Sequence, residues 1–422
     1  MRRPSEIEVF YLDFDGFFAS VEQQCDKRLR GRPVGIVPFE GTTRTCVIAC
    51  SREAKQHGVQ NVMNVQEAKA LCPDLILVPQ KPDLYRRAHN ALLSEIAAIN
   101  PVDAIKSIDE LTCKVQAADR HDPHSLGMKI KRRIAENIGQ AITCSIGFAA
   151  NRQLAKMACK AGKRTRDGCY GDGMAIWHPR DMAGPLFAVS LEDIPGVGSR
   201  MLRRLQRAGI HQMIQLLATE PKQMRQLWGN VTGERLWYAL NGYAVQTPPS
   251  GRSMYGHGRV LPPDGRKPLA ARDMSRLLIV KAARRMRRDG WYAGGLWLSL
   301  EIRGGSVHRS APLPGVHDYQ AVLLALDRLW SDILPTLKPR EQVFRVHVAL
   351  VDLTPATERQ LDLLINDDPI RRKWESISVA IDRLNGKYGK TLASVGLWNP
   401  PVGGHAGGKI SYTRIPRAED FW

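Results

Sequence analysis

Several features of membrane, secreted and zinc-binding proteins are missing from this sequence. No uninterrupted apolar run approaches the roughly 20 residues that a helix needs to cross a bilayer. Glu6 and Glu8 interrupt the basic start, so it does not match a secretory signal. None of the eight cysteines forms a Cys-x-x-Cys pair, and their spacing fits no tetrahedral zinc site. We therefore expect a cytoplasmic protein with reduced core cysteines and no membrane contact.

Acidic residues are few relative to basic ones. The 422 residues include 61 Lys and Arg against 42 Asp and Glu, which gives a formal net charge of +19. A solvated surface alone could carry this excess, but an anionic partner is the more frequent cause, and nucleic acid is the commonest such partner. The length predicts several domains, at about 100–200 residues each.

The first half of the chain alternates predicted strands and helices. Val9–Leu12 is an apolar run that stops at a polar tip, and Phe17–Cys25 then has helical periodicity with Asp15 as a candidate N-cap. Such a mixture is typical of an α/β or α+β domain. Further strands are predicted at 34–37, 46–50, 104–108, 111–115 and 142–146, and further helices at 52–57, 65–71, 83–100, 126–138 and 151–161.

The second half has a different organisation. Composition shifts near Pro185, and residues 191–217 have a helical pattern throughout. After a linker rich in Gly, Pro and Ser, the order strand, helix, strand, strand, helix, strand predicts a ferredoxin-like module. Its strands are expected at 255–260, 296–302, 306–313 and 343–350, and its helices at 270–289 and 319–334, with one more helix at 374–384.

Four acidic residues stand at the ends of predicted strands. Asp13 and Asp15 alternate, so an extended strand would point both to one face. Asp109 and Glu110 are adjacent, so both can face one site only if the chain turns there, as in a hairpin tip. Converging carboxylates repel each other without a cation, and they offer the hard oxygen ligands that Mg²⁺ or Mn²⁺ prefers. We therefore favour a metal site over separate helix caps and surface carboxylates.

Four motifs in order resemble a known family. They are Tyr11-Leu-Asp-Phe-Asp-Gly-Phe-Phe-Ala-Ser-Val-Glu22, Ser107-Ile-Asp-Glu110, Cys144-Ser-Ile-Gly-Phe148 and Asn151-Arg-Gln-Leu-Ala-Lys-Met-Ala158. Together they resemble the Y family of lesion-bypass DNA polymerases, and within it the bacterial polymerase IV and UmuC-like branches. The resemblance covers roughly residues 7–355.

This resemblance implies an α+β multidomain, right-hand polymerase. The palm would combine a ferredoxin-like sheet with helices, the thumb would carry a helix-hairpin-helix, and the ferredoxin-like module would be the little finger. The expected boundaries are 1–30 and 80–183 for the palm, 31–79 for small fingers, 184–242 for the thumb, 243–254 for a linker, 255–353 for the little finger and 354–422 for a tail.

The resemblance also implies the catalytic residues. Asp13, Asp109 and Glu110 would be the catalytic carboxylates. Together with the backbone carbonyl of Phe14, they would hold two Mg²⁺ ions, for which Mn²⁺ could substitute.

Four residues are expected to bind the incoming nucleotide. Phe18 stands where the family has an aromatic ring under the sugar, which leaves no room for a 2′-hydroxyl, and Lys163 aligns with a lysine that neutralises the triphosphate. Arg52 and Lys55 replace the usual Tyr and Arg that grip the triphosphate, and Lys55 lacks the bidentate fork of Arg. Each of these would otherwise be an ordinary core aromatic or surface cation.

Other positions depart from the family pattern. Thr112 and Lys114 replace an aromatic residue and an Asp that usually follow the catalytic Glu. Ala149 and Ala150 replace the usual Ser and Lys before the Asn of the last motif. These changes put nucleotide-binding detail in doubt and leave the three carboxylates intact.

Two regions are expected to bind DNA. Gly196, Val197 and Gly198 lie in a helix-hairpin-helix, whose glycines let backbone N–H groups approach a phosphate, although a tight helix-helix turn would need the same glycines. Arg284 and Arg288 belong to a basic helix of the little finger, which could equally be a solvated face.

A short peptide follows the little finger. Gln360, Leu361, Leu363 and Leu364 lie in Gln-Leu-Asp-Leu-Leu, which resembles the bacterial sliding-clamp peptide with Leu364 in place of Phe. Alternate apolar side chains of an extended peptide can fill a groove on a partner. A peptide of Gln and Leu is also common by chance, and its position after the last polymerase module favours the clamp.

The resulting prediction is a low-fidelity translesion DNA polymerase that acts as a monomer on primer-template DNA and dNTP. No segment suggests a separate proofreading exonuclease domain. Two alternatives remain: a palm-fold nucleotidyl cyclase, and a non-catalytic DNA-binding scaffold of a lesion-bypass complex.

Overall fold

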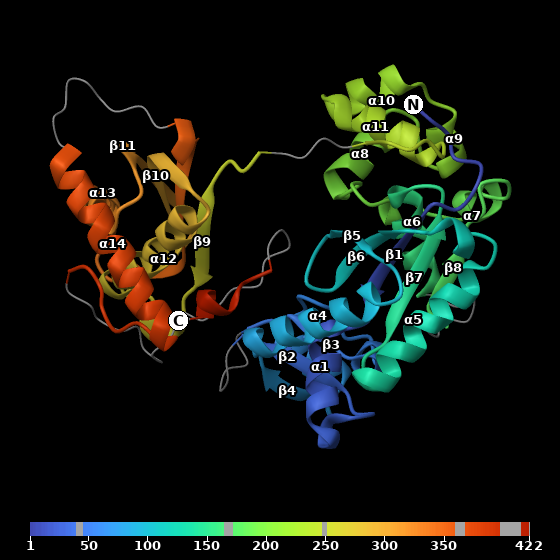
Figure 1. The fold of residues 1–422 in the computed structure, drawn as a ribbon, viewed down its shortest axis with the longest axis horizontal. Helices are drawn as coiled ribbons and strands as arrows, with labels where there is room; N and C mark the ends of the chain where they lie inside the picture. Colours follow the sequence, from blue (N-terminus) through green and yellow to red (C-terminus); the bar gives the residue numbers. More distant parts are fainter. Residues whose placement is uncertain (39–44, 164–171, 247–250, 359–367, 397–414, 422) are drawn as a thin grey trace. The chain divides into compact units, whose positions relative to one another are not determined.

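The computed structural model describes the chain except for residues 39–44, 164–171, 247–250, 359–367, 397–414 and 422. It has two compact units (Figure 1). The first comprises Met1–Pro248 with Ile410–Ile415, and the second comprises Pro249–Lys409 with Pro416–Trp422. The first separation falls inside the predicted linker at 243–254. Over the described residues, no helix combines the length and the apolar character needed to cross a membrane.

A five-stranded sheet forms the centre of the first unit. Its order is β5 (Val102–Ile105), β6 (Glu110–Lys114), β1 (Val9–Phe14), β7 (Cys144–Ala149) and β8 (Met174–Ile176). β1 lies in the middle and pairs antiparallel with both β6 and β7. The central strand, which carries the first acidic motif, is therefore held on both edges.

Alternation along β1 sends its side chains to two different cores. Phe10, Leu12 and Phe14 are buried against α4 (Pro82–Ala97) and α5 (Pro123–Asn137). Tyr11 points to the opposite face, which is covered by α6. α6 (Arg152–Gly162) comes so close to β7 that a Cβ on Gly147 would lie 2.0 Å from the Cys159 nitrogen.

A glycine makes the turn from β1 into α1 (Phe17–Cys25). Gly16 caps this helix at φ 54°, and a Cβ there would lie 2.9 Å from the carbonyl oxygen of Cys50. The prediction that Asp15 caps the helix is wrong, because no side chain caps it. Instead, the Asp15 carboxylate accepts hydrogen bonds from Thr143 and Ser145.

A smaller sheet, of order β3-β2-β4, lies within residues 31–79, the segment predicted to form the fingers. Its strands are β2 (Val34–Val37), β3 (Ala49–Cys50) and β4 (Ile76–Pro79), and two short helices, α2 (Arg52–Gln56) and α3 (Val65–Leu71), pack with it. The expected strand at 46–50 is reduced to β3, because Cys46 makes only an isolated bridge to Asn64.

Short helices complete the first unit. They are α7 (Ala183–Phe187), α8 (Ser199–Arg207), α9 (Met213–Leu217), α10 (Pro221–Trp228) and α11 (Val231–Leu240). Their apolar side chains share one core with α6 and Tyr11. The helical bundle and the central sheet therefore position each other.

The second unit has the predicted β-α-β-β-α-β order. Its elements are β9 (Tyr255–Val260), α12 (Pro268–Arg288), β10 (Trp291–Ile302), β11 (Gly305–Val316), α13 (Tyr319–Ile333) and β12 (Val343–Pro355), with the sheet order β11-β10-β12-β9. α12 and α13 bury an apolar core on one face of the sheet. Trp297, His308 and His347 form an aromatic cluster, with Trp297 stacked on His308.

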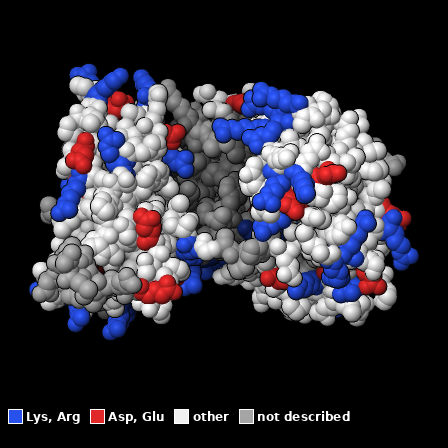
Figure 2. Space-filling view, turned by 90° about the horizontal axis from the view of Figure 1, so that it is seen from above, with Lys and Arg blue, Asp and Glu red and all other residues white. Residues whose placement is uncertain are grey.

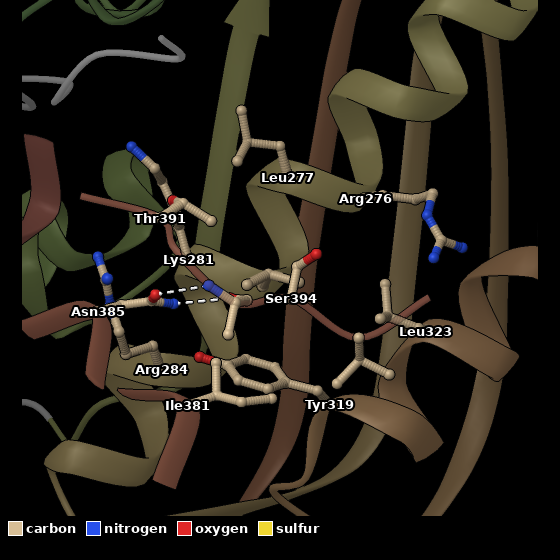
Figure 3. A pocket seen from close by; sticks show the side chains of 13 residues that line it. Arg276, Leu277, Lys281, Arg284, Tyr319, Leu323, Ile381, Asn385, Thr391 and Ser394 are labelled. Carbon is tan, nitrogen blue, oxygen red and sulfur yellow. Dashed lines mark hydrogen bonds between the residues drawn. The ribbon is translucent and has the colours of Figure 1, made fainter. Parts of the chain in front are cut away.

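The helix α14 (Asp368–Tyr388) packs on the helical layer of this unit. Asp382 accepts hydrogen bonds from Arg287 and Tyr319, and Arg371 pairs with the buried Asp318 at 3.0 Å. Asn385 binds the backbone of Ala393, which closes a small apolar pocket of about 50 Å³ against α12 and α13 (Figure 3). Much of the predicted tail thus belongs to the core of the second unit.

Candidate active site

Strand pairing brings the predicted carboxylates together. Asp13, near the end of β1, stands opposite Glu110, the first residue of β6. Asp109 precedes Glu110 in the hairpin between β5 and β6, and its carbonyl accepts a hydrogen bond from the Phe14 backbone at 2.9 Å. The chain does turn at Asp109, as the adjacent acidic pair required.

Two cavities are each lined by Asp13 and Lys163. One has a volume of about 390 Å³ and is lined by Phe14, Phe18, Lys55 and Asp109, among others. The other has a volume of about 540 Å³ and is lined by residues of three kinds of element: the sheet, α6 and the loop before α8. These are Tyr11, Glu110, Lys156, Cys159, Lys160 and residues 192–196.

Lys163 is the cation nearest to Asp13. Its Nζ lies 2.5 Å from an Asp13 oxygen and 3.7 Å from an Asp15 oxygen. Burial, with Asp109 and Glu110 nearby, raises the pKa of Asp13 to about 7 even though Lys163 lowers it. Burial alone would lower the pKa of Lys163, but the Asp13 carboxylate raises it above its ordinary value. Lys163 therefore stays charged, and the site still lacks positive charge.

Glu110 and Asp109 have partners of their own. Tyr11 donates a hydrogen bond to Glu110 at 2.7 Å, and the Lys156 Nζ lies 3.0 Å from both Glu110 oxygens. The Ser107 hydroxyl donates to Asp109. As they are placed here, no group of three or more His, Cys, Asp or Glu side chains in the described part of the chain could hold a metal ion.

The donor set nevertheless fits divalent cations. Lys163 forms an ion pair with Asp13, and Lys156 forms one with Glu110. Two ammonium groups thus occupy positions beside the three carboxylates. Mg²⁺ and Mn²⁺ prefer carboxylate oxygens as ligands, and the two cavities give access to these oxygens. An ion would bind after the lysines move away from the carboxylates. Lys side chains are flexible enough to do so.

Phe18, which lines the first cavity, is packed against a buried aromatic ring. Phe18 stacks on Tyr85 with ring centroids 4.4 Å apart and planes at 12°. The Tyr85 hydroxyl binds the buried Glu22 at 3.0 Å, and Glu22 also pairs with Lys81 at 2.7 Å. Phe18 is thus held by a ring that is itself anchored, which the sequence did not indicate.

Of the three cations predicted to contact the triphosphate, two line the first cavity and one does not. Lys55 and Lys163 line the first cavity, together with Asn61. Arg52 begins α2 and is exposed, and it is not among the residues that line this cavity. Asn61, whose side-chain oxygen accepts from the Cys50 backbone at 3.2 Å, was not predicted as a site residue.

One glycine of the predicted helix-hairpin-helix lies at the second cavity. Gly196 lines it and has φ 99°, whereas Gly198 caps α8 and Val197 is buried. No side chain covers the N-terminal amides of α8, which leaves them free to meet a phosphate.

The predicted DNA contacts of the second unit have intramolecular partners. Arg288 pairs with Glu419 at 2.6 Å, and Arg284 donates to the carbonyl of the same residue. The short turn η7 (Ala418–Phe421) therefore lies against this face of α12. On the face drawn in Figure 2, other Lys and Arg side chains are spread over both units. The clamp-like peptide of Gln360, Leu361, Leu363 and Leu364 lies outside the described residues.

Family models match two parts of the chain. Residues 12–160 match the impB/mucB/samB family, and residues 252–363 match the C-terminal domain of the same family. The first match contains the acidic site, and the second covers the β-α-β-β-α-β module.

Curated relatives match across nearly the whole chain. DNA polymerase IV of Moorella thermoacetica is 31% identical over 92% of this chain and 95% of its own length. DNA polymerase IV 1 of Bacillus subtilis is 28% identical over 92% of both chains.

Solved structures share the fold. A chimera of the Y-family polymerases Dbh and Dpo4 has a TM-score of 0.70 and 22% identity, over 82% of this chain and 99% of its own. An insertion ternary complex of Dbh DNA polymerase has a TM-score of 0.54 and 23% identity, over 82% and 98%. The predicted α+β multidomain fold is confirmed. Motifs, fold and relatives agree that this chain belongs to the impB/mucB/samB family and is a Y-family, lesion-bypass DNA polymerase.

Proposed function

We propose that Asp13, Asp109 and Glu110 hold two Mg²⁺ ions and catalyse transfer of a nucleotide from dNTP to a primer 3′-hydroxyl. The observation that carries this is the pairing of Asp13 with Glu110 beside Asp109, with an open cavity on each side. Family membership, which implies dependence on divalent metal ions, favours this role over a nucleotidyl cyclase or a non-catalytic scaffold.

The residues that line the two cavities would have different roles in the reaction. The primer 3′-oxygen bonds to the α-phosphorus while the bond to pyrophosphate breaks, and the hydroxyl proton is lost. When bound, the divalent ions lower the pKa of the attacking hydroxyl and stabilise the leaving oxygen. Asp13, Asp109 and the Phe14 carbonyl would serve the nucleotide side, and Glu110 the primer side. Lys163 would leave Asp13 for the triphosphate, because it lines the same cavity.

DNA and nucleotide would enter from opposite sides. The 390 Å³ cavity, floored by Phe18, would take the dNTP, with Lys55 near its phosphates. The 540 Å³ cavity, bordered by Gly196 and Lys160, would take the primer terminus. A related polymerase has been described in an insertion ternary complex, which supports these partners.

Fidelity, clamp binding and oligomeric state complete the proposal. Small fingers built on three short strands would enclose the nascent pair loosely, so fidelity would be low. The peptide at 360–364, which lies between β12 and α14 in the sequence, would bind the sliding clamp. The protein would act as a monomer, since the proposed catalytic carboxylates all come from one chain.

Removing one carboxylate tests the metal site. Asp109→Ala should slow primer extension on the order of a thousandfold, because metal-assisted charge stabilisation is worth several kcal/mol. Single-turnover extension of a labelled primer measures this, with Glu67→Ala, an exposed carboxylate of α3, as the matched control. Extension by Asp109→Ala at the rate of the control would contradict the proposed site.

Removing the Phe18 ring tests how the site discriminates between dNTP and rNTP. Phe18→Ala should raise ribonucleotide use relative to deoxynucleotide use by roughly tenfold or more, because it opens space for a 2′-hydroxyl. The measurement is the ratio of insertion efficiencies for matched rNTP and dNTP. Phe18→Tyr keeps the ring and should keep the ratio. An unchanged ratio in Phe18→Ala would remove this role.

The raised pKa of Asp13 predicts pH-dependent metal binding. A cation needs the ionised carboxylate, so below about pH 7 a proton competes, and affinity should fall by up to roughly tenfold per pH unit. Mn²⁺ titrations of the DNA-dNTP complex, followed by electron paramagnetic resonance, measure this. The Asp13→Asn variant should bind Mn²⁺ more weakly, and its affinity should depend less steeply on pH. Equal wild-type affinity at about pH 6 and about pH 8 would contradict the assignment.

A further inference from the structure

We propose that Tyr11 is a positioning residue that fixes Glu110 for the primer-side metal ion. The inference rests on the proposed role of Glu110 as a metal ligand. Tyr11 is 2% exposed, and its hydroxyl is the only part of it that can reach a carboxylate, 2.7 Å from Glu110 Oε2.

The direction of each hydrogen bond follows from the chemistry of the groups. Lys156 Nζ has only donors, so at 3.0 Å it donates to the Tyr11 oxygen, and the Tyr11 proton must point to Glu110. The hydroxyl is therefore a donor to one oxygen of this carboxylate.

The sheet provides room for the ring. Tyr11 stands opposite Thr112 on β6 and opposite Gly147 on β7, so a small residue flanks it on each side. The family's usual aromatic at the position of Thr112 is missing here, and a ring is supplied from the neighbouring strand instead. The Lys156 ammonium lies 5.0 Å from the centre of this ring.

The two partners of Glu110 differ in how readily they can move. Lys156 has 37% of its side chain exposed and lies on a flexible stem, so an entering cation can displace it. Tyr11 is enclosed in the core shared with α6 and cannot withdraw. Tyr11 therefore retains Oε2. Among the described residues Oε1 accepts from Lys156 alone, at 3.0 Å, and it turns to the ion when the lysine leaves.

A buried hydroxyl that merely satisfies a neighbouring carboxylate would contribute to folding alone. A positioning hydroxyl contributes to metal affinity as well, because it holds the ligand in the geometry that the ion needs. Metal affinity therefore separates the two roles, whereas a loss of activity would not.

The test uses the full chain bound to a dideoxy-terminated primer-template and the next dNTP. Free Mn²⁺ is followed by electron paramagnetic resonance during titration, and single-turnover extension with an ordinary primer is measured against Mg²⁺ concentration. Tyr11→Phe should weaken Mn²⁺ binding and raise the Mg²⁺ requirement by roughly fivefold, the factor that corresponds to a hydrogen bond of about 1 kcal/mol. The dNTP concentration for half-maximal rate should change less than about twofold.

Three further variants make the outcome decisive. Tyr319→Phe removes another tyrosine hydroxyl bound to a carboxylate, in the second unit, and should leave metal binding unchanged. Lys156→Met should bind Mn²⁺ at least as tightly as wild type, because it removes the competing cation. Wild-type Mn²⁺ affinity in Tyr11→Phe, or equal weakening in Tyr11→Phe and Lys156→Met, would overturn the proposal. Glu110→Gln tests the metal site independently: full Mn²⁺ binding there would refute the proposed function itself, whatever Tyr11 does.

Discussion

The structure depends on keeping several partly buried carboxylates close together. The pairing of β1 with β6 sets Asp13 opposite Glu110, and the hairpin before β6 adds Asp109. Without metal, two lysines of the α6 region offset part of this negative charge, at 2.5 Å and 3.0 Å. The close packing of α6 on β7, which Gly147 permits, is therefore an electrostatic requirement as much as a packing one.

Local pattern predicted most of the fold, and its errors have physical causes. The bounds of α1, α3, β2 and β9 follow the predicted ranges, because apolar periodicity and turn residues agree there. β4 and β8 were missed. Each is held by parallel pairing to a strand distant in the sequence, which no local pattern reveals. The expected strand at 46–50 failed because tertiary contacts leave only Ala49–Cys50 paired.

The carboxylates were predictable, but their partners were not. Strand ends and the acidic pair pointed to Asp13, Asp15, Asp109 and Glu110, and the family resemblance selected all of these except Asp15. Tyr11 and Tyr85 act across chain separations that no local pattern reveals. A weaker signal did exist in α6 and the residue after it: three lysines recur at spacings of four and three, which places them on one helical face. They are Lys156, Lys160 and Lys163.

The central claim is that divalent cations replace the lysines on these carboxylates when substrate binds. Anomalous diffraction from crystals of the full chain with dideoxy-terminated primer-template, dNTP and Mn²⁺ tests it most directly. The account predicts Mn²⁺ peaks between Asp13, Asp109 and Glu110, with Lys163 moved from Asp13 to the triphosphate. A well-ordered ternary complex with Lys163 still on Asp13 and no anomalous peak among the three carboxylates would contradict it.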